Sequence, residues 1–495
     1  ATEIAKLRLF LKMMAVVEVD FRADNLGLDP LPDIDFNIRC GNTLVGYATE
    51  EELAKDLTWG DMFANQEFKD KVETEMQLVA TAYETFKSVQ FTQSEDMAAF
   101  KQAKCGLNER LAKLNELLNR RMHAATSLPY DEWLRTHQPF HWLAEFYQII
   151  HDNGGFDVII GNPPYVGYTR KGKSTGKAVI ELYKISDKYK TLATSNLYAF
   201  TIERSYHLLE KKGKIGMIIP ISAFSNNSMK DLQTFIKQNS GSAWISNYHQ
   251  RPAQLFEGVL QRLSIFITDI GDKKRFYTSG IYRWYTNTRI YLFPNIFYQS
   301  MSQDKQSHVV KVGNNTEKSI FEKYACQKEV SVYLSDSEIA DNTVYYRTAG
   351  GGYWVTFLNA EFDCIAVSNK YASFKKEYNS KIFSAAFNSN LFWWYYSINY
   401  DLFNFKDYMI FGFQLTYPMS FVKELGKLSD LMENSLRNNA VYYQIKSKTA
   451  GVNQTVTYQK NLSKNEMDEI DKILAKHYGF TEEELDFIIN YDIKY

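Results

Sequence analysis

A short apolar run places the strongest constraint on the fold of this chain. Phe156–Gly161 contains three consecutive β-branched residues, and its length and composition are those of a buried parallel strand. In open α/β sheets, ligands bind beyond the carboxyl ends of such strands. The residues that follow directly, Asn162, Pro163, Pro164 and Tyr165, are therefore expected at a ligand-binding edge.

These four residues resemble the catalytic motif of amino-group methyltransferases, and their chemistry suits that task. The exocyclic amine of adenine is a poor nucleophile because its lone pair is delocalised into the ring. The side-chain oxygen of Asn162 and the carbonyl of Pro163 can accept its two N–H groups, and the prolines stiffen the loop beforehand. Tyr165 offers a face on which a flipped base can stack, a contact worth about 1–3 kcal/mol. The alternative interpretation is a Pro-Pro turn that only closes a strand.

The wider sequence resembles the γ-class DNA adenine-N6 methylases, and within them the type IIG restriction-modification (Eco57I-like) enzymes. Several blocks of residues follow one another in the order of that family. They are residues 41–44, 176–183, 196–200, 208–214, 215–220 and 254–259. The resemblance implies transfer of a methyl group from S-adenosylmethionine to adenine N6 in double-stranded DNA, by base flipping and within a restriction-modification system.

The resemblance also assigns roles to two residues outside the motif. Asn42 stands where the family usually has Asp at the adenine end of the cofactor, and an amide oxygen can still accept a hydrogen bond from the cofactor amine. Phe256 lies in the segment whose phenylalanine takes the second face of the flipped base. Tyr165 and Phe256 are therefore expected to form an aromatic sandwich.

The glycine-rich cofactor loop of the family is missing from this sequence. It should precede residue 41, but the first fourteen residues have the pattern of a helix, with Ile4, Leu7, Leu11 and Met14 on one face. The S-adenosylmethionine site is therefore expected to be incomplete. The chain looks like the carboxyl-terminal portion of a longer enzyme, whose upstream region would hold the cofactor loop and the nuclease.

A basic segment follows the motif. Residues 170–190 contain seven basic and two acidic residues, although the net charge of the whole chain is −1. Four of the basic residues, Arg170, Lys171, Lys173 and Lys177, are expected to contact DNA phosphates beside an extruded base. The alternative is an ordinary solvated lysine-rich loop.

Changes of pattern along the chain predict its organisation. Leu107, Leu111, Leu114 and Leu118 recur at helical spacing and indicate a helical insertion. After residue 270 the sequence becomes rich in aromatic residues interleaved with Arg, Asn and Lys, which can stack on bases and read their edges. The predicted fold is α/β, with an incomplete Rossmann-like methyltransferase core, a helical insertion and a mixed α+β target-recognition domain. The corresponding ranges are residues 1–50 and 151–270 for the core, 51–150 for the insertion, 271–460 for the target-recognition domain and 461–495 for a helical tail.

Other classes of protein fit poorly. The sequence has no apolar run long enough to span a membrane and no signal-peptide pattern, which favours a cytoplasmic protein of a prokaryote. The four cysteines lack metal-ligand spacing, and His137 with His141 lacks a third ligand, so no metal is expected. Pro32-Asp33 and Glu67-Phe68-Lys69 mimic a nuclease pattern, but Glu67 and Lys69 fall in a predicted helix.

Two other functions stay open at this stage. One is a DNA-binding specificity fragment that is inactive because the cofactor loop is absent. The other is a methyltransferase acting on RNA or on protein glutamine, since those enzymes share the Asn-Pro-Pro-Tyr motif. They are usually compact, however, and lack a large aromatic domain after the core.

Overall fold

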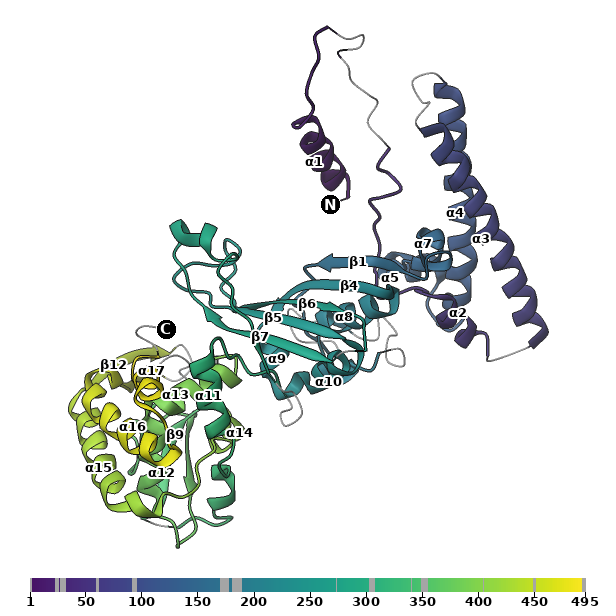
Figure 1. Cartoon of the computed structure of the whole chain (residues 1–495). Helices are drawn as coiled ribbons and strands as arrows, with labels where there is room; N and C mark the ends of the chain where they lie inside the picture. The colour runs from purple at the N-terminus through teal and green to yellow at the C-terminus, as the bar shows by residue number, and fades with distance from the viewer. Residues whose placement is uncertain are drawn as a thin grey trace. The chain divides into compact units, whose positions relative to one another are not determined.

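A computed structural model describes most of the chain and divides it into two units. Unit 1 comprises Ala1–Met217, Phe235–Gly241 and Ile267–Asp272, and unit 2 comprises Ile218–Thr234, Ser242–Phe266 and Lys273–Tyr495. The mixed α/β class predicted from the sequence is confirmed (Figure 1). The described residues are 2–22, 26, 33–58, 62–90, 96–169, 178–179, 189–272, 274–301, 308–339, 341–348, 355–403, 405–447 and 451–491.

The largest sheet of the described chain has six strands in the order β1-β4-β6-β5-β7-β8. β1 pairs parallel with β4, with Ile159 opposite Ile215, and β5 pairs parallel with β7. β8 runs antiparallel to β7. The strands are β1 (Phe156–Gly161), β4 (Leu209–Pro220), β5 (Ser242–Tyr248), β6 (Leu263–Asp269), β7 (Arg275–Tyr282) and β8 (Gln299–Ser300). The apolar run at 156–161 is thus a parallel strand, as expected.

The expectation that β1 is buried is wrong. Val158 is 58% exposed and Ile160 is 80% exposed. The reason is the place of β1 in the sheet, because β4 is its only hydrogen-bonded neighbour among the described strands. β-Branched apolar residues favour a strand conformation, but whether the strand is buried depends on neighbouring elements elsewhere in the sequence.

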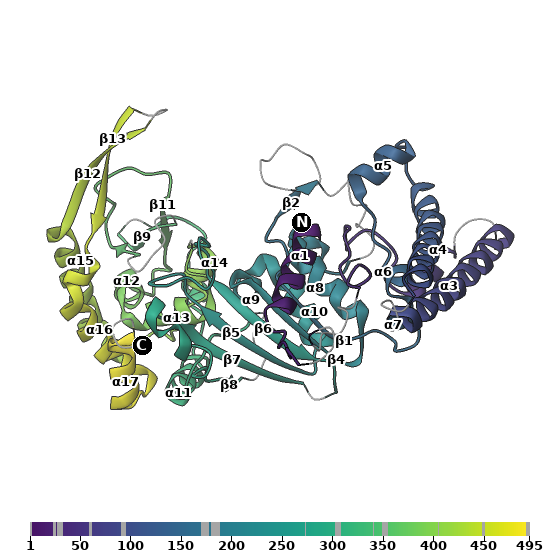
Figure 2. The same ribbon diagram turned by 90° about the horizontal axis from the view of Figure 1, so that it is seen from above.

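Helices make up most of the remainder of unit 1. The predicted helical insertion contains two long helices, α3 (Met62–Gln90) and α4 (Met97–His123), which lie side by side (Figures 1 and 2). Leu107, Leu111, Leu114 and Leu118 are buried on α4, as their spacing predicts. The other helices of this part are α1 (Thr2–Met14), α2 (Glu50–Asp56), α5 (Tyr130–His137), α6 (Trp142–Glu145), α7 (Tyr147–His151) and α8 (Leu197–Leu208).

The amino-terminal helix and the segment after residue 130 differ from simple amphipathic helices. The predicted amino-terminal helix exists as α1, but none of its side chains is buried, and Ile4 and Leu11 are exposed. The aromatic segment after residue 130 is divided into the three short helices α5, α6 and α7. Gln138 takes a left-handed conformation with φ of 45° and Pro139 lacks an N–H, so the helix ends there.

Unit 2 contains a second core of aromatic residues. Trp394, Tyr396 and Phe387 are among its buried members, so many aromatics of this region serve packing. Near the carboxyl end, α16 stops at Gly479 with φ of 70°, and Thr481 forms a capping box with Glu484. The elements of this unit include α11 (Asn315–Tyr324), α12 (Ser380–Asn388), α13 (Asn390–Asn399), α14 (Asp407–Phe411), α15 (Val422–Asn438), α16 (Lys464–Tyr478), α17 (Glu482–Ile489), β9 (Thr343–Arg347), β10 (Phe357–Leu358), β11 (Asn369–Ser373), β12 (Ala440–Ser447) and β13 (Gly451–Tyr458).

In the part of the chain that the structure describes, no helix is both long enough and apolar enough to cross a membrane. The domain boundaries given above remain a prediction, since the division into two units follows contacts and not the motif order.

Candidate active-site cavity

A cavity of about 820 Å³ in unit 1 gathers most of the residues that the motif analysis selected. Four regions of the chain supply most of its lining: β1 with the loop after it, a turn at 41–44, the end of α5 with the segment up to Trp142, and one face of α8. Asn42, Asn162, Pro163 and Pro164 all line this cavity. The sequence separation between the first two exceeds a hundred residues, so only the fold brings them together.

The loop after β1 holds Asn162 at the wall of the cavity. Pro163 is buried, whereas Asn162 and Pro164 are exposed. No described residue hydrogen-bonds the Asn162 amide, so its oxygen and nitrogen are available to a ligand. Farther along, the loop is tied to the start of α8, where Leu197 N–H donates to the Val166 carbonyl at 3.0 Å. A stiff loop fixed at both ends presents the amide without ordering cost on binding.

Tyr165 follows the lining residues and packs beside α8. Its ring lies 6.4 Å from the ring of the buried Tyr198 in a near-perpendicular arrangement of 86°. Partial burial raises the pKa of the Tyr165 hydroxyl to about 12. The residue therefore stays a neutral phenol at physiological pH, and its half-buried ring keeps one part available for contact.

The turn that carries Asn42 is fixed against the segment after α5. Asn42 N–H donates to the Gln138 carbonyl at 2.7 Å, and Leu44 N–H donates to the Asn42 side-chain oxygen at 3.2 Å. Gly46 has φ of 139°, and a Cβ there would lie 2.0 Å from the Phe140 carbonyl oxygen, so only glycine fits. The Asn42 oxygen keeps a second lone pair for a ligand because one amide oxygen accepts two hydrogen bonds.

The third wall comes from one face of α8. Thr201, Arg204 and Ser205 line the cavity together with Leu197 and Leu208, at the spacing of a single helical stripe. Sequence analysis did not select these residues, although that spacing within 197–208 was the available signal.

Buried charge fixes α8 in place. Arg204 is almost fully buried, donates from Nε to the Tyr189 hydroxyl at 3.0 Å and pairs through Nη1 with Glu52 of α2. The neighbouring Glu203 accepts the backbone N–H groups of Lys190 and Thr191, each at 2.9 Å. A buried charge without its partner is costly, so the Arg204–Glu52 pair ties α8 to α2.

The two histidines of this region are held by hydrogen bonds, and His137 also lines the cavity. His141 accepts the Tyr47 N–H on Nδ1 at 3.1 Å and contacts the Asn119 oxygen through Nε2 at 3.0 Å, so both ring nitrogens are engaged. His137 is buried at the end of α5, with Nδ1 3.1 Å from the Trp133 carbonyl. Among the described residues, no group of His, Cys, Asp and Glu is arranged to hold a metal ion.

The remaining predicted site residues lie elsewhere. Phe256 belongs to unit 2 and starts a tight turn, in which Val259 N–H donates to the Phe256 carbonyl at 3.2 Å and Gly258 has φ of 77°. The predicted phosphate contacts Arg170, Lys171, Lys173 and Lys177 lie outside the described residues. The cavity therefore brings together Asn42, Asn162, Pro163 and Pro164, and the other assignments keep the status of predictions.

Comparison with known proteins supplies relatives for this chain. It is 26% identical over 266 residues to a type II restriction enzyme and methyltransferase of Methanocaldococcus jannaschii, covering 45% of this chain and 21% of that protein. It is 28% identical over 206 residues to the type II restriction enzyme and methyltransferase Eco57I of Escherichia coli, covering 41% of this chain and 20% of that protein. The chain thus spans about a fifth of the length of these relatives.

Among solved structures, the type IIL restriction-modification enzyme MmeI in complex with DNA is similar over 90% of this chain and 77% of its own, at 10% identity and a TM-score of 0.39. The family model described as Eco57I restriction-modification methylase matches residues 1–256, which is more than half of the sequence. The chain belongs to the Eco57I restriction-modification methylase family.

Proposed function

We propose that the protein takes part in methyl transfer from S-adenosylmethionine to the N6 amine of adenine in duplex DNA, as part of a restriction-modification system. The observation that carries the proposal is the Asn162 amide on the wall of the cavity, with no hydrogen-bond partner among the described residues. Membership of a restriction-modification methylase family supports the same reaction. The resemblance of Asn-Pro-Pro-Tyr to the motif of amino-group methyltransferases supports an amine as the group that receives the methyl.

The chain would act on the amine by holding it. The Asn162 oxygen and the Pro163 carbonyl accept the two N–H groups of the adenine amine and orient its lone pair toward the methyl donor. The rigidity of the loop matters because acceptors that are already in place cost no reorganisation during the reaction. The nitrogen–methyl bond would form as the sulfur–methyl bond of the donor breaks, and the resulting cationic nitrogen, a far stronger acid than the neutral amine, would release its extra proton to water.

The extruded base needs stacking surfaces, and two aromatic residues are proposed for that role. Tyr165 follows Pro164 directly, and its neutral ring presents a π-face to the base. Phe256 is proposed as the second stacking residue from its place in the order of family segments. Each contact offsets part of the cost of unpairing and unstacking the target base.

The cavity also fits part of the cofactor. Its volume of about 820 Å³ exceeds the lower size of small-molecule sites, and its wall carries Asn42, whose oxygen keeps one lone pair for the adenine amine of the cofactor. S-adenosylmethionine supplies an electrophilic methyl group when it is bound. Residues 1–41 contain no Gly-x-Gly sequence, so we propose that the site in residues 1–495 is incomplete.

We propose that the later part of the chain supplies target recognition. Residues 271–460 carry aromatic residues interleaved with Arg, Asn and Lys, the types that stack on bases and read their edges. Arg170, Lys171, Lys173 and Lys177 are the proposed phosphate contacts beside the flipped base. In this proposal the core, including the sheet that starts at β1, is part of a Rossmann-like methyltransferase.

The identity of the product tests the proposal. The intact gene product that contains residues 1–495 is incubated with duplex DNA and S-adenosylmethionine labelled with tritium in the methyl group. The DNA is digested to nucleosides and separated by chromatography with mass detection. We expect the label in N6-methyldeoxyadenosine. Label in a methylated cytosine would contradict the assignment, as would transfer to RNA or to protein glutamine, and not to DNA, in parallel reactions that offer those substrates.

A further inference from the structure

The hairpin formed by β12 and β13 has two contrasting halves. Near its base, Val456 and Tyr458 are buried and belong to the core of unit 2. Beyond them Tyr443, Gln444 and Gln454 are exposed. Figure 2 shows the far half extending away from the helices of this unit. The hairpin is therefore anchored at its base, and Tyr443, Gln444 and Gln454 beyond the base are exposed to solvent.

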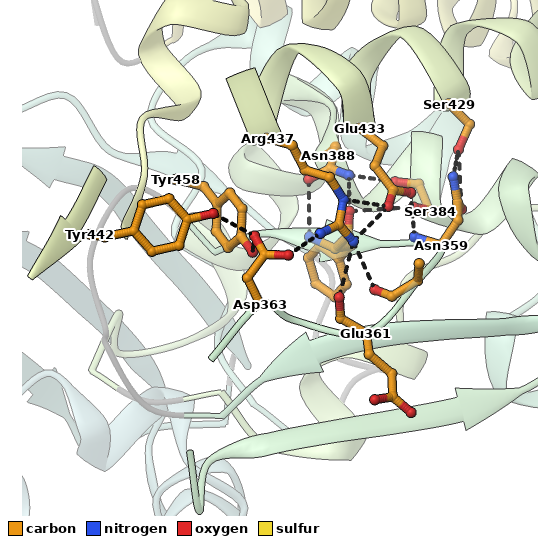
Figure 3. Close-up of polar contacts among 12 residues, drawn as sticks. Asn359, Glu361, Asp363, Ser384, Asn388, Ser429, Glu433, Arg437, Tyr442 and Tyr458 are labelled. Carbon is orange, nitrogen blue, oxygen red and sulfur yellow. Dashed lines mark hydrogen bonds and ion pairs between the residues drawn. The ribbon is translucent and has the colours of Figure 1, made fainter. Parts of the chain in front are cut away.

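A single carboxylate fixes the base of the hairpin. Asp363 Oδ2 accepts a hydrogen bond from the Tyr442 hydroxyl at 2.9 Å and another from the Tyr458 hydroxyl at 3.1 Å, one from each strand (Figure 3). Its other oxygen accepts Arg437 Nη1 at 2.7 Å. Arg437 in turn is held by Glu433, with Nε to Oε1 at 3.0 Å. Charge-assisted bonds of this kind set geometry well, so both strands leave the domain in a fixed direction.

In the exposed half, the described side chains place polar groups on both faces of the hairpin. In the register of the strands Gln444 lies opposite Gln454, and Tyr443 lies opposite Thr455 on the other face. An isolated two-stranded hairpin is marginally stable in water, because it buries little apolar surface. The contacts at the base therefore hold in place an exposed half-hairpin that adds little to the stability of unit 2. An element that is held in place without stabilising the domain suits a binding role.

The dimensions and chemistry of the hairpin suit duplex DNA. Residues 440–459 contain two lysines and no acidic residue, so a polyanion meets no repulsion from this segment. The major groove, about 12 Å wide, admits a two-stranded ribbon, and glutamine can bond both N6 and N7 of adenine. Strands rise about 3.3 Å per residue, so the strands extend about 17 Å past the pair Tyr442 and Val456, long enough to lie along the groove with one face toward the base edges.

We propose that this hairpin enters the major groove of duplex DNA and that Gln444 and Gln454, adjacent on one face, read base edges there. The inference rests on the proposed function, since it requires that the protein binds DNA. It adds a specific recognition element within residues 271–460. The partner is B-form duplex DNA with at least one A·T pair in the contacted positions.

The test compares the sequence preference of the full chain with that of a double variant. Duplexes with a randomised central region are selected by binding to residues 1–495, and the bound pool is sequenced. Affinity for the selected and for an unselected duplex is then measured by fluorescence anisotropy at several salt concentrations. The variant carries Gln444→Ala and Gln454→Ala. The control carries Asn434→Ala and Asn438→Ala, two exposed amides on α15.

We expect the double variant to lose about fivefold or more of the preference for the selected duplex, the minimum for one lost bidentate contact. Its affinity for the unselected duplex and its salt dependence should stay unchanged, because phosphate contacts determine both. The control variant should keep the preference of the wild type.

The outcomes separate the two proposals. A wild-type chain without salt-sensitive DNA binding contradicts the proposed function and this inference together. A wild-type preference that survives in the double variant overturns the hairpin assignment alone. Self-association of the wild type that the glutamine changes abolish, with the DNA preference intact, identifies a second copy as the partner and also overturns it.

Discussion

The indole nitrogen of Trp394 donates a hydrogen bond to the carboxylate of Glu317 at 3.0 Å, with both side chains buried in unit 2. Gly313 N–H donates to the other oxygen of the same carboxylate at 2.6 Å. Burial raises the pKa of Glu317 to about 7. Lys311 is buried in the same region, and burial lowers its pKa to about 7. Two ionisable groups thus sit in an aromatic core at a cost in stability.

Replacing Lys311 with Met should stabilise the protein. The Lys311 amine has no hydrogen-bond partner among the described residues. Its pKa falls from 10.5 to about 7 on folding, so between those values the unfolded chain binds a proton that the folded chain lacks. Burial of Lys311 therefore lowers the free energy of unfolding, and this loss grows as pH falls from 10.5 and reaches its full size below about 7.

Thermal unfolding at pH 6 and pH 9.5 measures this effect. Exchange of a buried charge for an apolar side chain typically gains up to about 4 kcal/mol, so the melting temperature of Lys311→Met should rise, and by more at pH 6. The exposed Lys423→Met serves as the control and should change little. A gain that is equal at both pH values, or a fall in melting temperature at pH 6, would contradict this account.

Asn162→Ala should abolish methyl transfer while leaving duplex binding almost intact. Loss of preorganised acceptors typically reduces the rate about 100-fold or more, whereas phosphate contacts dominate the affinity for DNA. Tritium transfer and gel-shift affinity are measured on the same preparation of the intact gene product. Asn153→Ala, an exposed asparagine just before β1, provides the matched control. Retention of more than about a tenth of the wild-type rate is incompatible with the proposed role.

A fluorescent base reports whether adenine leaves the helix. With 2-aminopurine at the target position, binding should change the emission, and Tyr165→Ala or Phe256→Ala should raise it by removing a stacking partner that quenches. Phe63→Ala, at an exposed position of α3, should behave as the wild type. An emission that does not change when the wild type saturates the duplex argues that the base stays stacked.

Residues 1–495 alone should show no calorimetric binding of S-adenosylmethionine at tens of micromolar. Asn42 offers one hydrogen bond, which nets about 0.5–1.5 kcal/mol, and micromolar binding needs about 8 kcal/mol. Salt-sensitive DNA binding should nevertheless persist in the same sample. Tight binding of the cofactor would mean that residues assigned to the insertion or to recognition complete the site.

Elements with local signals could be predicted from the sequence. The leucines of α4 recur at helical spacing and are buried, and Gly479 ends α16 because a left-handed residue is easiest for glycine. The Thr481–Glu484 capping box lies within four residues. Each of these features depends on residues that are close in the sequence, so it can be predicted before the fold is known.

Features that depend on distant partners could not be predicted. Arg204 meets Glu52 across 152 positions, and Asp363 meets Tyr442 and Tyr458 across 79 and 95. No repeating pattern in the sequence indicates that residues so far apart are paired. The exposure of β1 was missed for the same reason, since an apolar run looks alike in the centre and at the edge of a sheet. In the cavity, the motif at Asn162 was predictable; the helical spacing within 197–208 predicts a shared helix face, but only the fold shows that this face of α8 meets the cavity.

The position of β1 at the edge of its sheet affects how the protein behaves in concentrated solution. One side of this strand has unpaired N–H and C=O groups in the described chain, and the apolar side chains of Val158 and Ile160 are exposed beside them. Edges of that kind recruit other strands, including those of identical molecules. Purified residues 1–495 are therefore expected to form aggregates as the concentration rises, unless another strand covers β1. The extent of aggregation at a given concentration then measures how well that edge is protected.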